Sequence, residues 1–199
     1  MSYGTWRSVA TLPRTFVGLM NDELSRLAAK YEGNLPDLRS DSTLLLGSDY
    51  SGEHDDSPYL VFSFLMTTLE SWSEWEPRRQ SVRAVHLKDS RRMSFKQLRD
   101  RNRQHALGPL LEAANGLRGL SLTIAVNKKC PSFFAEPSPL DLTNPAFMPY
   151  EKWKPSVLTK ALFVVHLLGV LLAGLAAPRQ DVLWFTDEDS IAANDDRLP

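Results

Sequence analysis

The sequence predicts an α/β fold in which helices flank a mixed five-stranded sheet. The chain has 199 residues, 43% of them hydrophobic and 24% charged, which suits a globular protein with a sizeable core. Five short runs that contain apolar residues are interspersed with segments of helical pattern, and the run over residues 59–68 is rich in β-branched and aromatic residues. Three strands in a meander, followed by strands joined through helices, would combine antiparallel with parallel pairs.

Two regions are expected, an N-terminal extension over residues 1–42 and the main domain over residues 43–199. Within the extension, Asn21 or Asp22 is a suitable N-cap for a short helix. Gly33 is well suited to end that helix, because glycine is the usual residue after the last helical turn.

The main domain is expected to open with a hairpin of two strands, over residues 43–49 and 59–68, joined by a polar turn that contains Gly52. The segment 71–77 is predicted to be a loop. Its two tryptophans either pack on the core or form a lid or partner surface. A third strand is predicted over residues 82–87.

The next predicted element is a helix that begins at Ser94, where Gln97 would complete a capping box. Gly108–Pro109 is expected to kink or split this helix, because proline lacks a backbone donor. A fourth strand is predicted over residues 120–126, and a proline-rich loop over residues 131–149.

An uncharged stretch of 17 residues, from 161 to 177, predicts a long apolar helix that begins near Pro155. Its length is at the short limit for crossing a bilayer. A helix packed against a sheet explains it equally well, and the flanking strands favour that interpretation, so no membrane contact is expected. The last strand is predicted over residues 182–186.

Cysteine content and the N-terminus bear on location. Cys130 is the single cysteine, so neither a disulfide framework nor a cysteine-rich zinc site is expected. Residues 1–10 lack the apolar run of a signal peptide. A cytoplasmic protein is therefore expected.

Acidic residues follow the first and the last predicted strands. Asp49 ends the first strand, and Asp187, Glu188 and Asp189 end the last, where strand alternation favours Asp187 and Asp189 over Glu188. If the two strands are neighbours, these carboxylates converge and need a cation, Mg²⁺ or Mn²⁺. Such a centre can cleave phosphodiester bonds. The simpler alternatives are that Asp49 caps a turn and Asp189 caps a helix.

Basic residues concentrate between positions 78 and 103, where ten Lys or Arg are opposed by two acids. This imbalance is typical of a surface that binds nucleic acid, DNA or RNA, although a solvated basic helix face is the plainer interpretation. The candidates for contact with the phosphate backbone are Arg91, Arg92, Lys96, Arg99 and Arg103.

The element order and the string Ser48-Asp49-Tyr50-Ser51-Gly52 resemble the ribonuclease H-like fold of integrases and Holliday-junction resolvases. The string is similar to the Asp-Glu-Ser-Gly opening of a large group of uncharacterised bacterial proteins with that fold. The resemblance covers roughly residues 43–199. It implies that Asp49 is the first catalytic aspartate and that the final acid comes from the cluster 187–189.

Two residues depart from the pattern of that group. Tyr50 stands where the group has an acid, and Asn127 replaces the aspartate before Lys128. Asn127 can still offer its carbonyl oxygen to a metal, and Lys128 would either hold the scissile phosphate or remain solvated. That fold usually continues into a further helix, which leaves open whether the domain is complete at residue 199.

Two functions are therefore expected. The first is a divalent-metal-dependent nuclease or a related phosphoryl-transfer enzyme. The second is an inactive ribonuclease H-like module that binds nucleic acid or a protein partner. A homo-oligomer is compatible with both functions.

Overall fold

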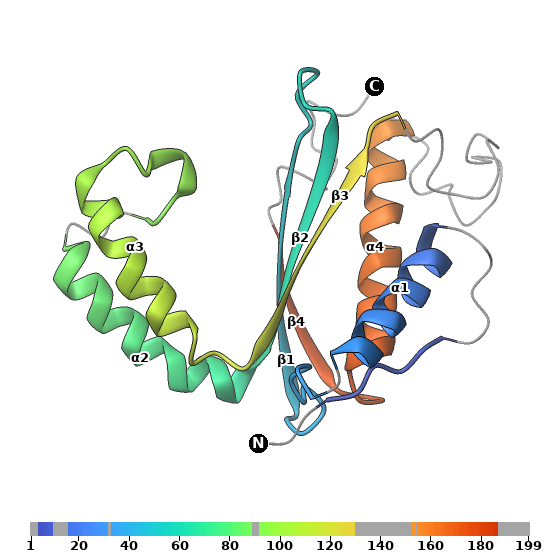
Figure 1. The fold of residues 1–199 in the computed structure, drawn as a ribbon, viewed down its shortest axis with the longest axis horizontal. Coiled ribbons are helices and arrows are strands. Elements are labelled where there is room, and N and C mark those ends of the chain that lie inside the picture. Colours follow the sequence, from blue (N-terminus) through green and yellow to red (C-terminus); the bar gives the residue numbers. More distant parts are fainter. Residues whose placement is uncertain are drawn as a thin grey trace.

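The fold is α/β, with a four-stranded mixed open sheet flanked by helices (Figure 1). The computed structural model describes residues 4–9, 16–31, 33–88, 92–129, 153 and 155–186. In chain order the elements are α1 (Phe16–Lys30), β1 (Thr43–Ser51), β2 (Tyr59–Thr68), α2 (Leu69–His86), the short 3₁₀ helix η1 (Phe95–Gln97), α3 (Arg101–Ala114), β3 (Gly119–Asn127), α4 (Pro155–Leu175) and β4 (Asp181–Thr186).

The strands lie in the order β3-β2-β1-β4. β1 and β2 form the predicted antiparallel hairpin, β2 and β3 are also antiparallel, and β4 runs parallel to β1. The hairpin turn requires a glycine, because Gly52 has a φ of 85° and a side chain there would overlap the carbonyl group of Tyr59.

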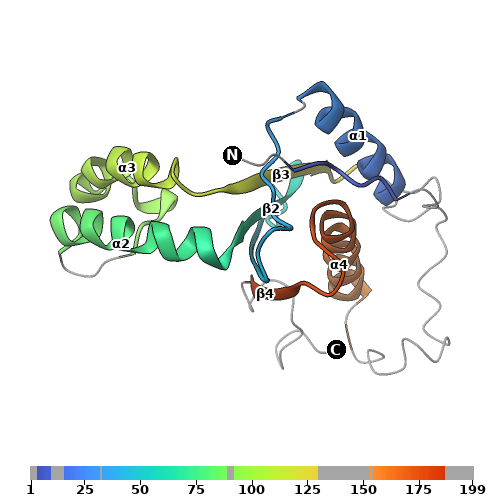
Figure 2. The same ribbon diagram turned by 90° about the horizontal axis from the view of Figure 1, so that it is seen from below.

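The two faces of the sheet are covered differently. α4 and α1 lie on one face, and the pair α2–α3 projects away from the other (Figures 1 and 2). On the α4 face, Leu44, Leu46, Phe62 and Phe64 are each at most 1% exposed. The Phe62 ring lies 4.7 Å from that of Phe163 in α4, so the hydrophobic core sits between α4 and the sheet.

The apolar helix is confirmed as a packing element. Val164, Leu167 and Leu171 of α4 are buried in the core. By length and composition, Val157–Leu175 is the one helix of the described chain that would also suffice to cross a membrane, and 44% of that stretch is buried.

The predictions for residues 71–77 and 82–87 are wrong, since residues 71–77 and 82–86 belong to α2 and Leu87 is its C-cap. The Thr68 side chain caps this helix by accepting a hydrogen bond from the backbone nitrogen of Ser71 at 3.2 Å. The β-branched residues that predicted a strand instead lie on a helix surface, where Val85 is 62% exposed. The described sheet therefore has four strands rather than five.

The following helix also begins later than predicted. Asp100, not Ser94, is the N-cap of α3, while Ser94 and Gln97 belong to a turn in which the Gln97 nitrogen donates to the Ser94 carbonyl at 3.1 Å. The helix continues through Gly108–Pro109, although proline removes one backbone donor. We refer to α2, α3 and their connection, residues 69–118, as the helical arm.

The N-terminal residues pack onto the domain. α1 begins at Phe16, so Asn21 is not an N-cap but a buried residue within the helix. Its Oδ1 accepts a hydrogen bond from the backbone nitrogen of Val9 at 3.1 Å. Trp6 lies against α4 at Gly174, and the Phe16 ring is 5.1 Å from that of Phe163.

Candidate functional site

The carboxyl ends of β1 and β4 lie side by side. The last pair of the two parallel strands joins Ser48 to Thr186. These residues immediately precede Asp49 and Asp187 in the sequence. The predicted acids can converge only if these two strands are neighbours, and the structure shows that they are.

Polar side chains join these strand ends on the α4 face. The indole nitrogen of Trp184 and the hydroxyl of Tyr50 each donate to Ser48 Oγ, both at 2.8 Å. The Thr186 hydroxyl donates to that of Tyr50 at 3.3 Å. Tyr50, which stands in the place of an expected acid, thus helps to fix the two strands.

This hydrogen-bonded group of Ser48, Tyr50, Trp184 and Thr186 was not predicted from the sequence. A signal for it exists, because Ser48 and Tyr50 alternate along β1 as Trp184 and Thr186 do along β4, and alternate residues share a face. Lys160 of α4 adds a cation, which lies 5.2 Å from the centre of the Tyr50 ring.

Asp49 lies on the opposite face, where it is exposed. Its carboxylate makes no hydrogen bond or ion pair with another residue of the described chain. In the sheet it is opposite Ser63, which is in turn opposite Thr123, and the hydroxyl oxygens of these two are 3.1 Å apart. Asp49 therefore begins a row of oxygen-bearing side chains across three strands.

The acids predicted to complete the site, Asp187, Glu188 and Asp189, lie outside the described residues. Among the residues that are described, no group of three or more His, Cys, Asp or Glu is placed to hold a metal. Asp49 is thus the one predicted acid whose position the structure gives.

The structure does not bring Asn127 to Asp49. β3 is the edge strand beside β2, whereas the neighbours of β1 are β2 and β4. Thr123, which lies across the sheet from Asp49, is four residues before Asn127. Asn127 is therefore displaced from Asp49 by about 13 Å along the strands and about 10 Å across them.

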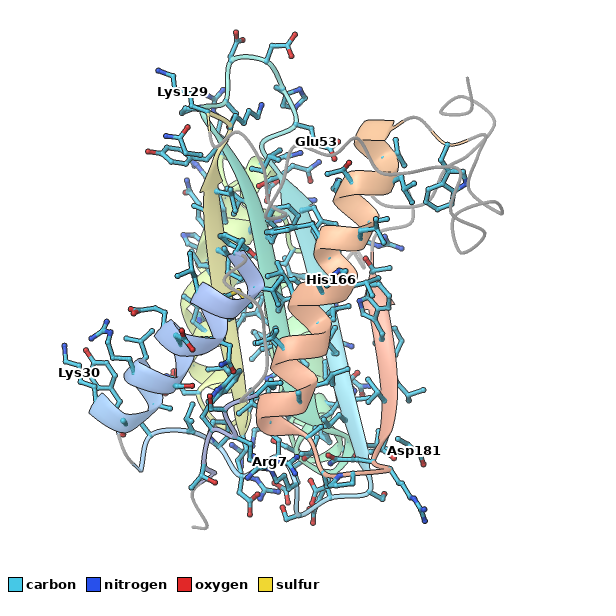
Figure 3. The ribbon with its side chains drawn as sticks, turned by 90° about the vertical axis from the view of Figure 1, so that its right-hand side faces the viewer. Arg7, Lys30, Glu53, Lys129, His166 and Asp181 are labelled. Atoms are coloured by element: carbon cyan, nitrogen blue, oxygen red, sulfur yellow. The ribbon has the colours of Figure 1, made fainter. Side chains whose placement is uncertain are left out.

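Asn127 and Lys128 take part in a turn instead. The Asn127 side-chain oxygen accepts a hydrogen bond from the backbone nitrogen of Lys129 at 2.9 Å, and Lys128 Nζ donates to the carbonyl of His54 at 2.6 Å. Figure 3 shows Lys129 and Glu53 at this end of the sheet, with Asp181 at the opposite end. Lys128 thus holds the end of β3 to the β1–β2 turn, while the Asn127 side chain stabilises the local turn after β3.

The predicted phosphate-binding residues are on the helical arm. Arg92, Lys96 and Arg99 are exposed near its far end, and Arg91 lies outside the described residues. Arg103 differs, because its guanidinium donates to the carbonyl of Arg92 at 3.0 Å and lies 3.8 Å from a carboxylate oxygen of Asp100. Arg103 therefore has a structural role at the start of α3.

An apolar pocket of about 430 Å³ lies on the Asp49 face, where the base of α2 meets the sheet. Trp72, Leu45, Leu183 and Phe185 are among its lining residues. Thr67 is the one lining residue with a hydroxyl group, which donates to the Arg118 carbonyl at 2.7 Å. This pocket offers apolar contact but no acid or base.

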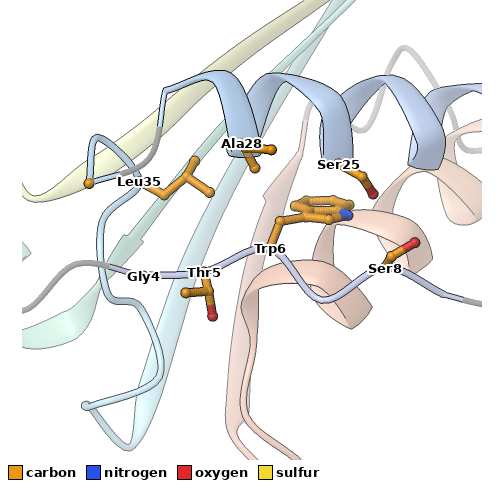
Figure 4. Close-up of a pocket in the computed structure, with 9 residues that line it drawn as sticks. Gly4, Thr5, Trp6, Ser8, Ser25, Ala28 and Leu35 are labelled. Carbon is orange, nitrogen blue, oxygen red and sulfur yellow. The ribbon is translucent and has the colours of Figure 1, made fainter.

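A second pocket, of about 300 Å³, lies between the N-terminal segment and α1 (Figure 4). Trp6, Ser8 and Ser25 line it, and none of its lining residues carries a titratable side chain. It contains none of the predicted site residues, so the Asp49 edge remains the candidate for chemistry.

Comparisons with protein-family models, with curated proteins and with solved structures find no match to the chain.

Proposed function

We propose that the protein is a divalent-metal-dependent nuclease of ribonuclease H-like type that acts on DNA or RNA. The observation that carries this proposal is the parallel pairing of β1 with β4, which ends at Ser48 and Thr186. Adjacent strands are about 4.8 Å apart, so carboxylates that follow these two residues are near enough to share a cation.

Asp49 fits the ligand set of Mg²⁺ or Mn²⁺. It is exposed, and no described cation is paired with it, so its oxygens are available to a hard ion that prefers oxygen ligands. Asp187 and Asp189 would complete the set, with Glu188 as the alternative acid. When bound, the metal supplies an activated water and charge stabilisation at a phosphodiester. Arg92, Lys96 and Arg99 would hold the phosphate backbone.

One observation favours the second candidate, a non-catalytic module that binds nucleic acid or a protein. Asn127 and Lys128, the residues expected to add a ligand and a phosphate contact, lie away from Asp49 and hold a turn. A site that keeps Asp49 without them has fewer groups for chemistry. Binding through the helical arm does not depend on these residues.

The test is cleavage of labelled single- and double-stranded DNA and RNA with Mg²⁺ or Mn²⁺. We expect Asp49→Asn to lower the rate by at least about 100-fold, as is typical when a group that stabilises developing charge is lost. Asp181→Asn is the matched control, because Asp181 is an exposed acid at the opposite end of the sheet, and it should leave the rate unchanged (Figure 3).

Equal rates for Asp49→Asn and the unaltered chain would exclude Asp49 from the site. Absence of cleavage with nucleic acid still bound would support the non-catalytic module. Circular dichroism of each variant checks that the fold is retained.

A further inference from the structure

The helical arm stands apart from the hydrophobic core. α2 has 18 residues and is therefore about 27 Å long. The two helices bury very little, since Ser71 is the one buried residue of α2 and Ala106 that of α3. Figures 1 and 2 show the arm contacting the rest of the molecule at its base alone.

Charge is segregated along the arm. The base, residues 69–77, has three Glu and no Lys or Arg, whereas the distal part, residues 78–103, has ten Lys or Arg and two Asp. Arg79 pairs with Glu76 at 2.5 Å, and Arg118 with Glu70 at 3.3 Å, so part of the acidic charge at the base is neutralised.

Several of the distal cations are unpaired within the part of the chain that the structure describes. Six exposed side chains make no ion pair with the described residues: Arg78, Lys88, Arg92, Lys96, Arg99 and Arg101. Like charges so close together repel each other and are stabilised by a polyanion. Neutralisation of several phosphates releases counterions, which is the main source of affinity for nucleic acid.

The aromatic residues decide between single and double strands. Proteins that hold single strands stack bases on exposed aromatic rings. The distal part contains one Phe, Tyr or Trp, namely Phe95. Trp72 and Trp75 lie at the base and pack on each other, with ring centres 4.8 Å apart, while Arg79 lies 5.8 Å from the Trp75 ring. These rings are therefore already partnered.

We infer that the helical arm binds the phosphate backbone of double-stranded nucleic acid and so selects a duplex substrate for the Asp49 edge. This inference rests on the proposed function for the role of the substrate, but binding by the arm can be measured without cleavage. Contacts to phosphates carry no sequence information, so binding should be independent of sequence.

The experiment is fluorescence anisotropy of the full chain with a labelled duplex and the matching single strand, in EDTA and over a salt series. We expect the duplex to bind at least about 10-fold more tightly than the single strand, because phosphate density is higher. The test variant changes five distal cations together: Arg78→Gln, Arg92→Gln, Lys96→Gln, Arg99→Gln and Arg101→Gln.

This variant should lose at least about 10-fold in duplex affinity and lower the salt slope by up to about 4.5, at about 0.9 for each of five phosphate contacts. Lys30→Gln with Lys129→Gln is the control, since both lysines are exposed and lie outside the arm (Figure 3). The inference is overturned if the control variant loses as much duplex affinity as the five-cation variant. It is also overturned if the single strand binds as tightly as the duplex or more tightly, or if the protein binds anionic lipid vesicles and not the duplex.

Asp49→Asn separates the two proposals. It should abolish metal-dependent cleavage, whereas the five-cation variant should lose duplex binding in EDTA. If the arm binds as expected and no metal-dependent cleavage is found, the nuclease proposal fails and the arm inference stands. If cleavage depends on Asp49 but the five-cation variant binds the duplex normally, the arm inference fails and the nuclease proposal stands.

Discussion

Gly174 provides a test of how the N-terminal segment is joined to the domain. A Cβ atom added at Gly174 would lie 2.6 Å from Cζ2 of the Trp6 indole, well inside normal contact distance. The local backbone is fixed, because the Gly174 carbonyl accepts hydrogen bonds from the Arg7 nitrogen at 3.0 Å and from Arg39 Nη2 at 2.7 Å. The indole must therefore move to accommodate a methyl group.

The expected effect of Gly174→Ala is a net loss in the free energy of unfolding. Overpacking costs about 1–3 kcal/mol, and the better helix propensity of alanine returns up to about 1 kcal/mol. Gly169→Ala is the matched control in the same helix, since no atom lies within 4 Å of an added Cβ there. That substitution should stabilise the protein by up to about 1 kcal/mol.

Urea unfolding measures both variants, and the midpoints can be compared directly if the slope with denaturant is unchanged. Adding Trp6→Ala to Gly174→Ala should cost less than the sum of the two single changes, because the truncated side chain removes the clash. If Gly174→Ala behaves as Gly169→Ala does, Trp6 does not pack on α4 and the reasoning is refuted. Residues 4–9 would then contribute little to the core.

Two further predictions concern the helical arm. Asp100→Ala removes the carboxylate that accepts a hydrogen bond from the Arg103 nitrogen at 3.0 Å, and should cost about 1 kcal/mol of helix stability. Hydrogen exchange should quicken in the first turn of α3 but not in α4. Hydrogen bonding to Arg79 lowers the pKa of Glu76 to about 2. The Glu76–Arg79 pair should contribute at most about 1 kcal/mol to the free energy of unfolding. This contribution should be full above about pH 4.5 and should fall as the pH drops towards about 2. Glu76→Gln should abolish that part of the pH dependence of unfolding, and an unchanged profile would exclude the pair as its source.

Much of the sheet was predictable because its signals are local. The β1–β2 hairpin follows from two β-rich runs around Gly52, and α4 follows from an uncharged stretch whose length suits a core helix. The prediction of β4 over residues 182–186 is also confirmed, and it is one residue longer. In each case the pattern of the segment and its packing favour the same conformation.

α3 was predicted, although with an earlier start, but α2 was not, because the signals in its sequence conflict. Pro77 and the valines at 82 and 85 argue against a helix, while Thr68 and the pair Glu76–Arg79 favour one. Pairing of α2 with α3 decides between them, and this contact joins segments that are separated in the chain. A window of sequence does not contain that information.

The correction at residues 82–87 changes which acids can meet. With that segment in a helix, the strand over residues 119–127 follows β2 directly and becomes the edge of the sheet, so Asn127 is two strands from β1. The neighbour of β1 on its other side is β4. The cluster 187–189, and not Asn127, is then the partner expected for Asp49, so a metal site at this edge has to form without Asn127. The proposed nuclease therefore needs Asp49 and the acids that follow β4 as its metal ligands. The cleavage test with Asp49→Asn addresses the first of these ligands.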